Sequence, residues 1–304
     1  MFLENVNKGH NHFWRYLVGI FIIIIIYFIA SLPAGILMSL AMLRGADLSQ
    51  FQNNMDFSTL GINPNIGLIV LLLPSVASFF GMMLVTRLHN RTFLSLLTAY
   101  KKIRWRRMLF GALVWLLLLI IAECVAYFME PGNYELNFNL KLFIPLIFIS
   151  LLLIPLQAAS EEILFRGYLM QGFSKLALYR WVPLIITAAG FGLMHGLNPE
   201  VKEYGTGLTM PYYIGFGLLM GIIAIMDDGL EIPIGIHAIN NIYGALFITF
   251  SGSALQTAAV FKLKHYDASL MLIMWVVMAL LFLIIIANRF GWKGWVKIFR
   301  KIET

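Results

Sequence analysis

Long apolar runs separated by short polar segments make up most of the chain. A helix needs about 20 apolar residues to cross the hydrocarbon core of a bilayer. On that rule the pattern predicts eight membrane-spanning helices, at about residues 16–42, 66–87, 108–129, 141–160, 181–198, 209–226, 232–251 and 269–289. We therefore expect an all-α, polytopic integral membrane protein, with residues 1–304 forming a single transmembrane domain.

Two of these runs have notable ends. The first, which starts at Tyr16, is too long for the apolar core of a signal peptide, so we expect a retained transmembrane helix. The fourth does not stop at its glutamates, because apolar residues continue from Ile163 to Met170. We expect that continuation to remain at membrane depth.

Composition and charge support the same class. Hydrophobic residues make up 60% of the chain and charged residues only 12%, whereas soluble domains carry about 25% charged residues. The net charge of +7 fits basic cytoplasmic loops, so we expect a lipid bilayer as partner and no nucleic acid. With the N-terminus inside, 17 of the 22 Lys and Arg residues fall on the cytoplasmic side and 5 on the other. This bias predicts that both termini are cytoplasmic.

Smaller features refine this picture. Residues 89–107 combine apolar residues at helical spacing with a basic cluster, which predicts a helix lying in the headgroup region. The single cysteine, Cys124, excludes an intramolecular disulfide and a cysteine-based metal site. Histidines in loops and tails, His89 among them, are expected to be solvated.

Three charged residues lie inside the apolar run at 160-SEEILFRGYLM-170. Glu162 and Arg166 are four residues apart and share one helix face, so they are expected to form an ion pair. Glu161 points about 100° away and has no local counter-ion. A buried carboxylate of this kind can accept a proton near neutral pH. The alternative is a salt-bridged helix end at the cytoplasmic interface, which explains Glu161 poorly.

Two histidines add further polar groups. His195 follows Phe191 by one turn in 191-FGLMHGL-197, and His237 precedes Asn241 by one turn in 237-HAINN-241. A single histidine in a membrane often only bonds a neighbouring helix. A carboxylate, two imidazoles and an amide together suffice to activate a water and to stabilise an oxyanion. Glu123, in the third span, is expected to hydrogen-bond another helix in its neutral form; the alternative is that it faces the site.

The ordered motifs EExxxR, FxxxH and HxxxN, over about residues 158–245, resemble those of the CPBP intramembrane proteases. This is the CAAX-protease and bacteriocin-processing group, also called Abi, which includes the type II CAAX prenyl endopeptidases. The resemblance implies an intramembrane endopeptidase that acts on membrane-associated or hydrophobic peptides or on membrane proteins. The resemblance implies that Glu161 is the general base and that His195 assists it. It implies that His237 and Asn241 together stabilise the oxyanion. The implied supporting residues are Glu162, Arg166 and Phe191.

Several alternatives stay open at this point. We favour a site without metal or other cofactor, but Glu161, His195 and His237 also match the ligand types of a catalytic zinc site. A proton-coupled transporter and a non-catalytic scaffold or immunity protein are the rival functions. Short loops and abundant Ile and Phe favour a bacterial cell membrane. The sequence indicates neither the substrate nor the oligomeric state.

Overall fold

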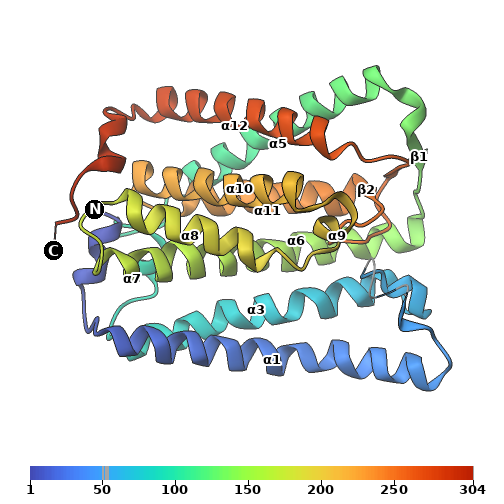
Figure 1. The fold of residues 1–304 in the computed structure, drawn as a ribbon, viewed down its shortest axis with the longest axis horizontal. Helices are drawn as coiled ribbons and strands as arrows, with labels where there is room; N and C mark the ends of the chain where they lie inside the picture. The colour runs from blue at the N-terminus through green and yellow to red at the C-terminus, as the bar shows by residue number, and fades with distance from the viewer. Residues whose placement is uncertain (50, 52–54, 304) are drawn as a thin grey trace.

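Helices form most of the regular structure in the computed structural model, which describes residues 1–49, 51 and 55–303 (Figure 1). The α-helices are α1 Phe13–Leu43, α3 Pro64–Leu88, α4 Leu94–Leu97, α5 Trp105–Met129, α6 Leu140–Glu162, α7 Met170–Ser174, α8 Trp181–Met194, α9 Pro199–Tyr204, α10 Thr206–Asp227, α11 Glu231–Leu246 and α12 Ala268–Phe290. A π-helical segment, η4 Ile163–Leu169, joins α6 to α7. The 3-10 helices are η1 Leu3–Asn7, η2 Phe57–Leu60, η3 Pro131–Asn133 and η5 Trp295–Phe299.

Each of the eight predicted spans corresponds to a long helix, but only six of them, counted over the described residues, are long and apolar enough to cross a bilayer. The two that fall short are α8, with 14 residues, and α11, with 16. Helix α8 stops early because Asn198 precedes a proline and takes an extended conformation, which a helix cannot continue through. Helix α11 ends just before a short strand. The structure therefore supports six of the eight predicted spans by length and composition.

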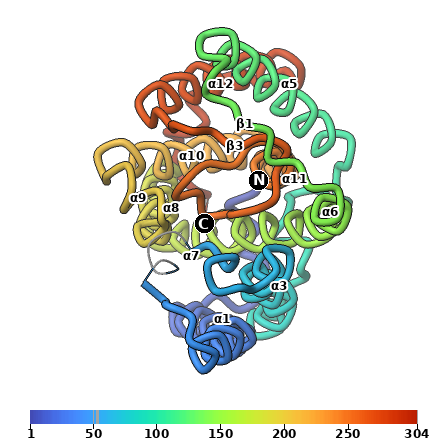
Figure 2. The backbone as a smooth tube through the Cα atoms, turned by 90° about the vertical axis from the view of Figure 1, so that its right-hand side faces the viewer, coloured from blue at the N-terminus to red at the C-terminus, as the bar shows by residue number. Residues whose placement is uncertain are grey.

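The helices lie side by side and run along the long axis of the molecule (Figure 1). Helices α1 and α3 pack together on one side, and α3 packs on α6; α5 and α12 lie on the opposite side. Between them, α11 packs on both α5 and α6, while α8 packs on α10. Both chain termini lie at one end of this bundle, which we call the terminal end. Figure 2 looks onto the other end and shows α6, α8, α10 and α11 around its centre.

A small sheet lies at the end opposite the termini (Figure 1), which we call the sheet end. Its strands are β1 Tyr134–Leu136, β2 Ile248–Phe250 and β3 Phe261–Leu263, in the order β1-β3-β2. Strand β1 runs antiparallel to β3, with Tyr134 opposite Leu263, and β2 runs parallel to β3, with Ile248 opposite Phe261. Strands of three residues are too short to show an alternating pattern in the sequence.

Helix α6 continues through η4 into α7, so the chain stays helical from Leu140 to Ser174. This confirms that the fourth run does not end at its glutamates. Short π-helical segments are rare and occur frequently at functional sites. In η4 the chain also approaches its neighbour closely, because a Cβ on Gly167 would lie 2.6 Å from the Leu96 carbonyl oxygen.

The prediction of an interfacial helix over residues 89–107 was wrong. Only Leu94–Leu97 is α-helical in the part of this segment that precedes α5. Polar side chains turn inward instead: Arg91 bonds Ser95 and Gln171. His89 is 1% exposed, and its Nε2 lies 2.9 Å from the Tyr168 hydroxyl, so it is not solvated as expected. The segment therefore packs into the terminal end.

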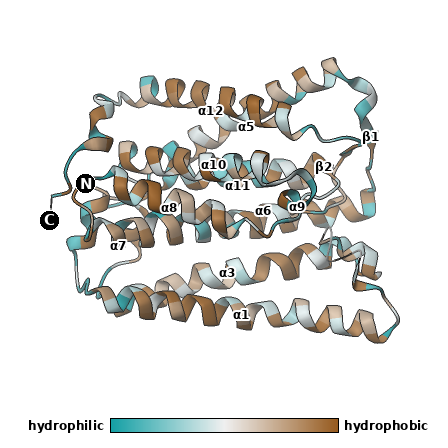
Figure 3. Ribbon diagram, in the orientation of Figure 1, coloured by the Kyte–Doolittle hydropathy of each residue, from teal (hydrophilic) through white to brown (hydrophobic). Residues whose placement is uncertain are grey.

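The outer surface along the helices is apolar, and polar residues gather at the two ends (Figure 3). The exposed apolar side chains include Phe21, Phe28, Leu113, Phe148, Leu152 and Leu280. Lipid replaces water as the solvent for such surfaces in a membrane protein. Apolar helices of sufficient length and this surface together indicate an integral membrane protein.

Candidate active site

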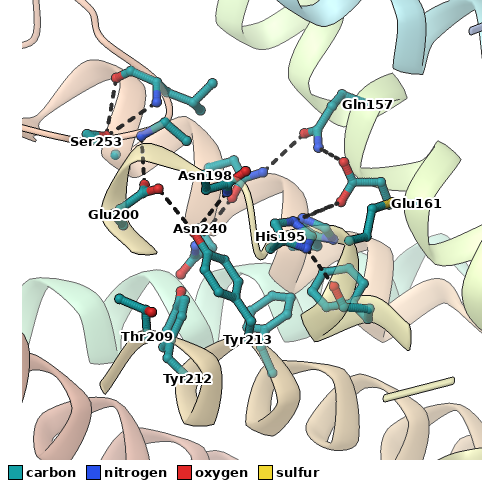
Figure 4. Close-up of a pocket in the computed structure, with 18 of the residues that line it drawn as sticks. Gln157, Glu161, His195, Asn198, Glu200, Thr209, Tyr212, Tyr213, Asn240 and Ser253 are labelled. Atoms are coloured by element: carbon teal, nitrogen blue, oxygen red, sulfur yellow. Dashed lines mark hydrogen bonds and ion pairs between the residues drawn. The ribbon is translucent and has the colours of Figure 1, made fainter. Parts of the chain in front are cut away.

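Three helices bring together Glu161, His195 and His237, which are far apart in the sequence. Glu161 lies in α6, His195 follows the last residue of α8, and His237 lies in α11. The Nε2 atom of His237 is 3.7 Å from Glu161 Oε2, and the Nε2 atom of His195 is 3.9 Å from the same oxygen (Figure 4). The predicted base and both predicted histidines therefore share one site.

Each imidazole is held in place through its other nitrogen. Nδ1 of His237 lies 2.9 Å from Glu162 Oε1, and Nδ1 of His195 lies 2.8 Å from the backbone carbonyl of Phe191. Because each Nδ1 faces an acceptor, it carries the proton in the neutral ring, and the Nε2 lone pair then points towards Glu161. The hydrogen bonds thus set both the ring orientation and the tautomer.

Glu162 and Arg166 form the ion pair expected from their spacing. Arg166 Nη1 donates to Glu162 Oε1 over 2.9 Å, and both side chains are fully buried. Arg166 also donates to the Gly217 carbonyl in α10, and its guanidinium lies 4.6 Å from the centre of the Phe191 ring. These contacts connect η4 with α8, α10 and the His237 ring.

Gln157 belongs to the site, although sequence reasoning missed it. Its Nε2 donates to Glu161 Oε1 over 2.6 Å, and its Oε1 accepts from Asn241 Nδ2 over 3.1 Å. It therefore connects the predicted base, beside which it lies in Figure 4, with the predicted oxyanion residue. The available signal was an amide four residues before Glu161, on the same face of an apolar helix.

Tyr213 of α10 is a second residue that the sequence did not reveal. Its ring stacks on His195, with 4.5 Å between centroids and 22° between planes. Its hydroxyl accepts from Asn198 over 3.0 Å and donates to Glu200 over 3.3 Å. Burial raises the pKa of Glu200. Asn198 and Glu200 thus hold the Tyr213 ring in place against the His195 ring.

These residues line a cavity of about 750 Å³. Its walls include residues of α1, α3, α5, α6, α8, α10, α11 and α12. Asn240 and Asn241 both line it, as does Glu123. Glu123 also accepts a hydrogen bond of 2.6 Å from Tyr134 of β1. Its partner is therefore in a strand and not in another long helix. A cavity of this size is typical of a ligand site.

The distances around Glu161 bear on the zinc alternative. Across the described residues, no cluster of three or more His, Cys, Asp or Glu side chains has metal-site geometry. The atoms that would bind zinc are Glu161 Oε2 and the Nε2 atoms of His195 and His237. Tetrahedral ligands at bond lengths of about 2.0–2.1 Å lie roughly 3.3 Å apart. These three side chains would therefore have to move closer together, although their Nδ1 partners are of the kind found around zinc-bound histidines.

Comparison with known proteins shows a match to one family over the part of the chain that contains this site. Residues 141–243 match the family model described as "Type II CAAX prenyl endopeptidase Rce1-like", and this range contains Glu161, His195, His237 and Asn241. The chain is also 27% identical over 248 residues to the uncharacterized protein YyaK of Bacillus subtilis (strain 168). That match covers 81% of each of the two chains. No solved structure matches the chain.

Proposed function

Residues 141–243 form an Rce1-like domain of the type II CAAX prenyl endopeptidase (CPBP) family, and on that premise we propose that the protein is an intramembrane endopeptidase. Membership of this family implies a CAAX-type intramembrane protease. The proposed reaction is hydrolysis of peptide bonds in membrane-associated or hydrophobic peptides, in the bacterial cell membrane. Glu161, His195, His237 and Asn241 are the proposed catalytic residues.

The observation that carries the proposal is the convergence of two imidazole nitrogens on one oxygen of Glu161. Separations of 3.7 and 3.9 Å are too long for direct hydrogen bonds and suit a water molecule held between the groups. Glu161 Oε2 is buried and has no hydrogen-bond partner among the described residues, so it is able to accept a proton from such a water. In the proposed mechanism, Glu161 activates the attacking water and then delivers the proton to the leaving amine.

The same geometry supports the proposed oxyanion site. Asn241 uses one N–H for Gln157 and has a second one to donate. His237, whose Nδ1 faces Glu162, can also donate from Nε2 when both of its nitrogens carry protons. Both side chains line the cavity beside Glu161. Donors positioned in advance in this way stabilise the charge that develops on the carbonyl oxygen.

Metal dependence is a separate part of the proposal. We favour a reaction in which Glu161 acts without metal. If zinc is required, Glu161, His195 and His237 would hold it, and zinc would supply a more acidic bound water. The metal-free and the zinc-dependent reactions can be distinguished, because a strong chelator removes activity only if zinc is required.

The test is cleavage of a quenched fluorescent library of hydrophobic peptides by the purified protein in liposomes, with and without a strong chelator. The comparison is between wild type, Glu161→Gln and the control Ser150→Ala, which alters a buried polar residue elsewhere in α6. Loss of a general base is expected to lower the rate by about 10²- to 10⁴-fold, while Ser150→Ala keeps its activity. Equal cleavage by Glu161→Gln, or no cleavage of any peptide by a well-folded wild type, would contradict the proposal. The latter result would favour a scaffold or a transporter.

A further inference from the structure

The cavity extends from the site towards the sheet end of the bundle. Besides the residues around Glu161, its lining includes side chains from loops, strand β2 and the short helix α9 at that end. They are Met55, Glu200, Phe250, Ser253, Leu255 and Tyr266. Glu200 and Ser253 lie on one side of the cavity in Figure 4, away from Glu161. All six residues are partly exposed, in contrast to the fully buried side chains at the opposite end of the cavity.

The opposite direction is filled by a packed core. Between the site and the terminal end lies a cluster of buried side chains that draws on η1, α3, η4, α8 and α10. Its members Phe2, Met82, Ile163, Met170 and Ala224 are all fully buried. The buried pair of Glu162 and Arg166 lies beside it. Among the described residues the cavity lining includes none from η1 or α7, at the terminal end.

The two ends also differ in charge. The sequence assigns 17 Lys and Arg residues to the terminal end. One of them, Arg166, is buried in the core, so 16 remain at that end. The sheet end has five: Arg44, Lys141, Lys202, Lys262 and Lys264. Short loops with an excess of Lys and Arg remain in the cytoplasm. The sheet end therefore faces the other side of the membrane.

We propose that the catalytic cavity opens to the extracytoplasmic side, so that the substrates are peptide segments that reach the membrane from that side. This inference rests on the proposed protease function. Tyr27 and Phe28 of α1 line the cavity and are 47% and 66% exposed, so its wall also borders the lipid. The substrate class that fits is a peptide or membrane protein with an apolar segment in the bilayer and its cleavage site near the outer surface. A cytoplasmic chain end would meet the packed core instead.

Cysteine labelling tests the orientation without any need for cleavage. Cys124 is the only cysteine, so Cys124→Ala provides a cysteine-free background. In that background, Ser251→Cys reports on the sheet end and Lys101→Cys on the terminal end, both at exposed positions. Intact cells are treated with a membrane-impermeant maleimide. We expect labelling of Ser251→Cys in intact cells and of Lys101→Cys only after permeabilisation; the reverse pattern would overturn the proposal.

A matched pair of positions tests whether the cavity is open. Ser75 of α3 lines the cavity and lies 11 residues from the sheet end of its helix, while Ser31 of α1 lies 12 residues from the same end and does not line it. Maleimides react with the thiolate, which forms in water and not in hydrocarbon. Ser75→Cys is therefore expected to react in intact cells, and Ser31→Cys to remain unlabelled. If Ser75→Cys reacts only after permeabilisation, or if both react alike, the proposed access is wrong.

Sided vesicles connect this inference with activity. A quenched peptide fused to an apolar membrane anchor is added to right-side-out and to inside-out vesicles that contain the wild-type protein. We expect cleavage in the right-side-out vesicles and its loss in the inside-out vesicles. Cleavage confined to inside-out vesicles would overturn the sidedness and leave the protease function intact. Absence of cleavage in both, together with the expected labelling, would count against the protease function alone.

Discussion

Nδ1 of His237 lies 2.9 Å from Oε1 of Glu162, the same oxygen that accepts from Arg166. The two adjacent glutamates therefore have different surroundings. Glu161 faces the cavity with one oxygen available, whereas Glu162 is fully buried and holds both a cation and an imidazole. This relationship explains how a short motif in α6 orients a histidine in α11.

Removal of one member of the buried ion pair should destabilise the fold. Arg166→Ala leaves Glu162 as a buried charge without its cation, and a broken buried pair costs about 3–5 kcal/mol in the free energy of unfolding. The matched control is Lys264→Ala, which removes an exposed pair with Glu135 at 4.0 Å and should change the free energy of unfolding by about 1 kcal/mol or less. Denaturant unfolding in detergent measures both. Similar values for the two variants would contradict this account.

Gln157 should act as a positioning residue. Gln157→Ala removes the hydrogen bonds to Glu161 and Asn241, so the base and the amide lose their fixed geometry. We expect kcat to fall about tenfold, which corresponds to about 1.4 kcal/mol, with little change in KM. Ser150→Ala, on the same helix, serves as the control and should retain both values. A rise in KM with an unchanged kcat would indicate a role in substrate binding instead.

The stacking of Tyr213 on His195 leads to a graded prediction. Tyr213→Phe keeps the ring and loses the hydrogen bonds to Asn198 and Glu200, whereas Tyr213→Leu loses the aromatic contact as well. Aromatic pairs contribute about 0.5–1.5 kcal/mol beyond the area that they bury. Catalytic efficiency should therefore fall further in Tyr213→Leu than in Tyr213→Phe. Steady-state kinetics on the same peptide would detect the difference, and an equal loss in both variants would assign the effect to the hydroxyl.

His89 should make stability depend on pH. Burial, together with nearby Arg91 and Arg15, lowers the pKa of His89 to about 4. The unfolded chain binds this proton near pH 6.5 and the folded chain only near pH 4, so stability is lost as pH falls through that window. At pH 5 the loss from this group is on the order of 2 kcal/mol or less.

The measurement is thermal unfolding in detergent at pH 7.5 and pH 5. His89→Asn should show a smaller decrease between the two conditions than wild type. His265→Asn, which alters an exposed histidine, should behave like wild type. An unchanged decrease in His89→Asn would assign the effect to other groups.

Gly167 should tolerate no side chain. Gly167→Ala would place a Cβ 2.6 Å from the Leu96 carbonyl, so backbone must move, and we expect a loss of about 1–3 kcal/mol in the free energy of unfolding. At Gly35, in α1, a Cβ would meet no atom within 4 Å. Gly35→Ala should therefore be neutral or slightly stabilising. Unfolding midpoints of the two variants provide the comparison.

Features that depend on local spacing could be predicted from the sequence. Apolar runs located eight helices, and six of them, among the described residues, have the length and apolarity that a bilayer requires. The ion pair of Glu162 with Arg166 followed from the helical repeat, and the three motifs indicated the family. Each of these requires only neighbours along the chain.

Contacts between distant segments could be known only from the folded structure. The bond from Gln157 to Asn241, the stacking of Tyr213 on His195 and the contact of buried His89 with Tyr168 join residues that are 18 to 84 positions apart. Helix ends, such as the early stop of α8 before Pro199, and the short strands also depend on packing and turns. Contacts between distant segments are set by how helices pack, and the polarity pattern of a single helix specifies its faces but not its neighbours.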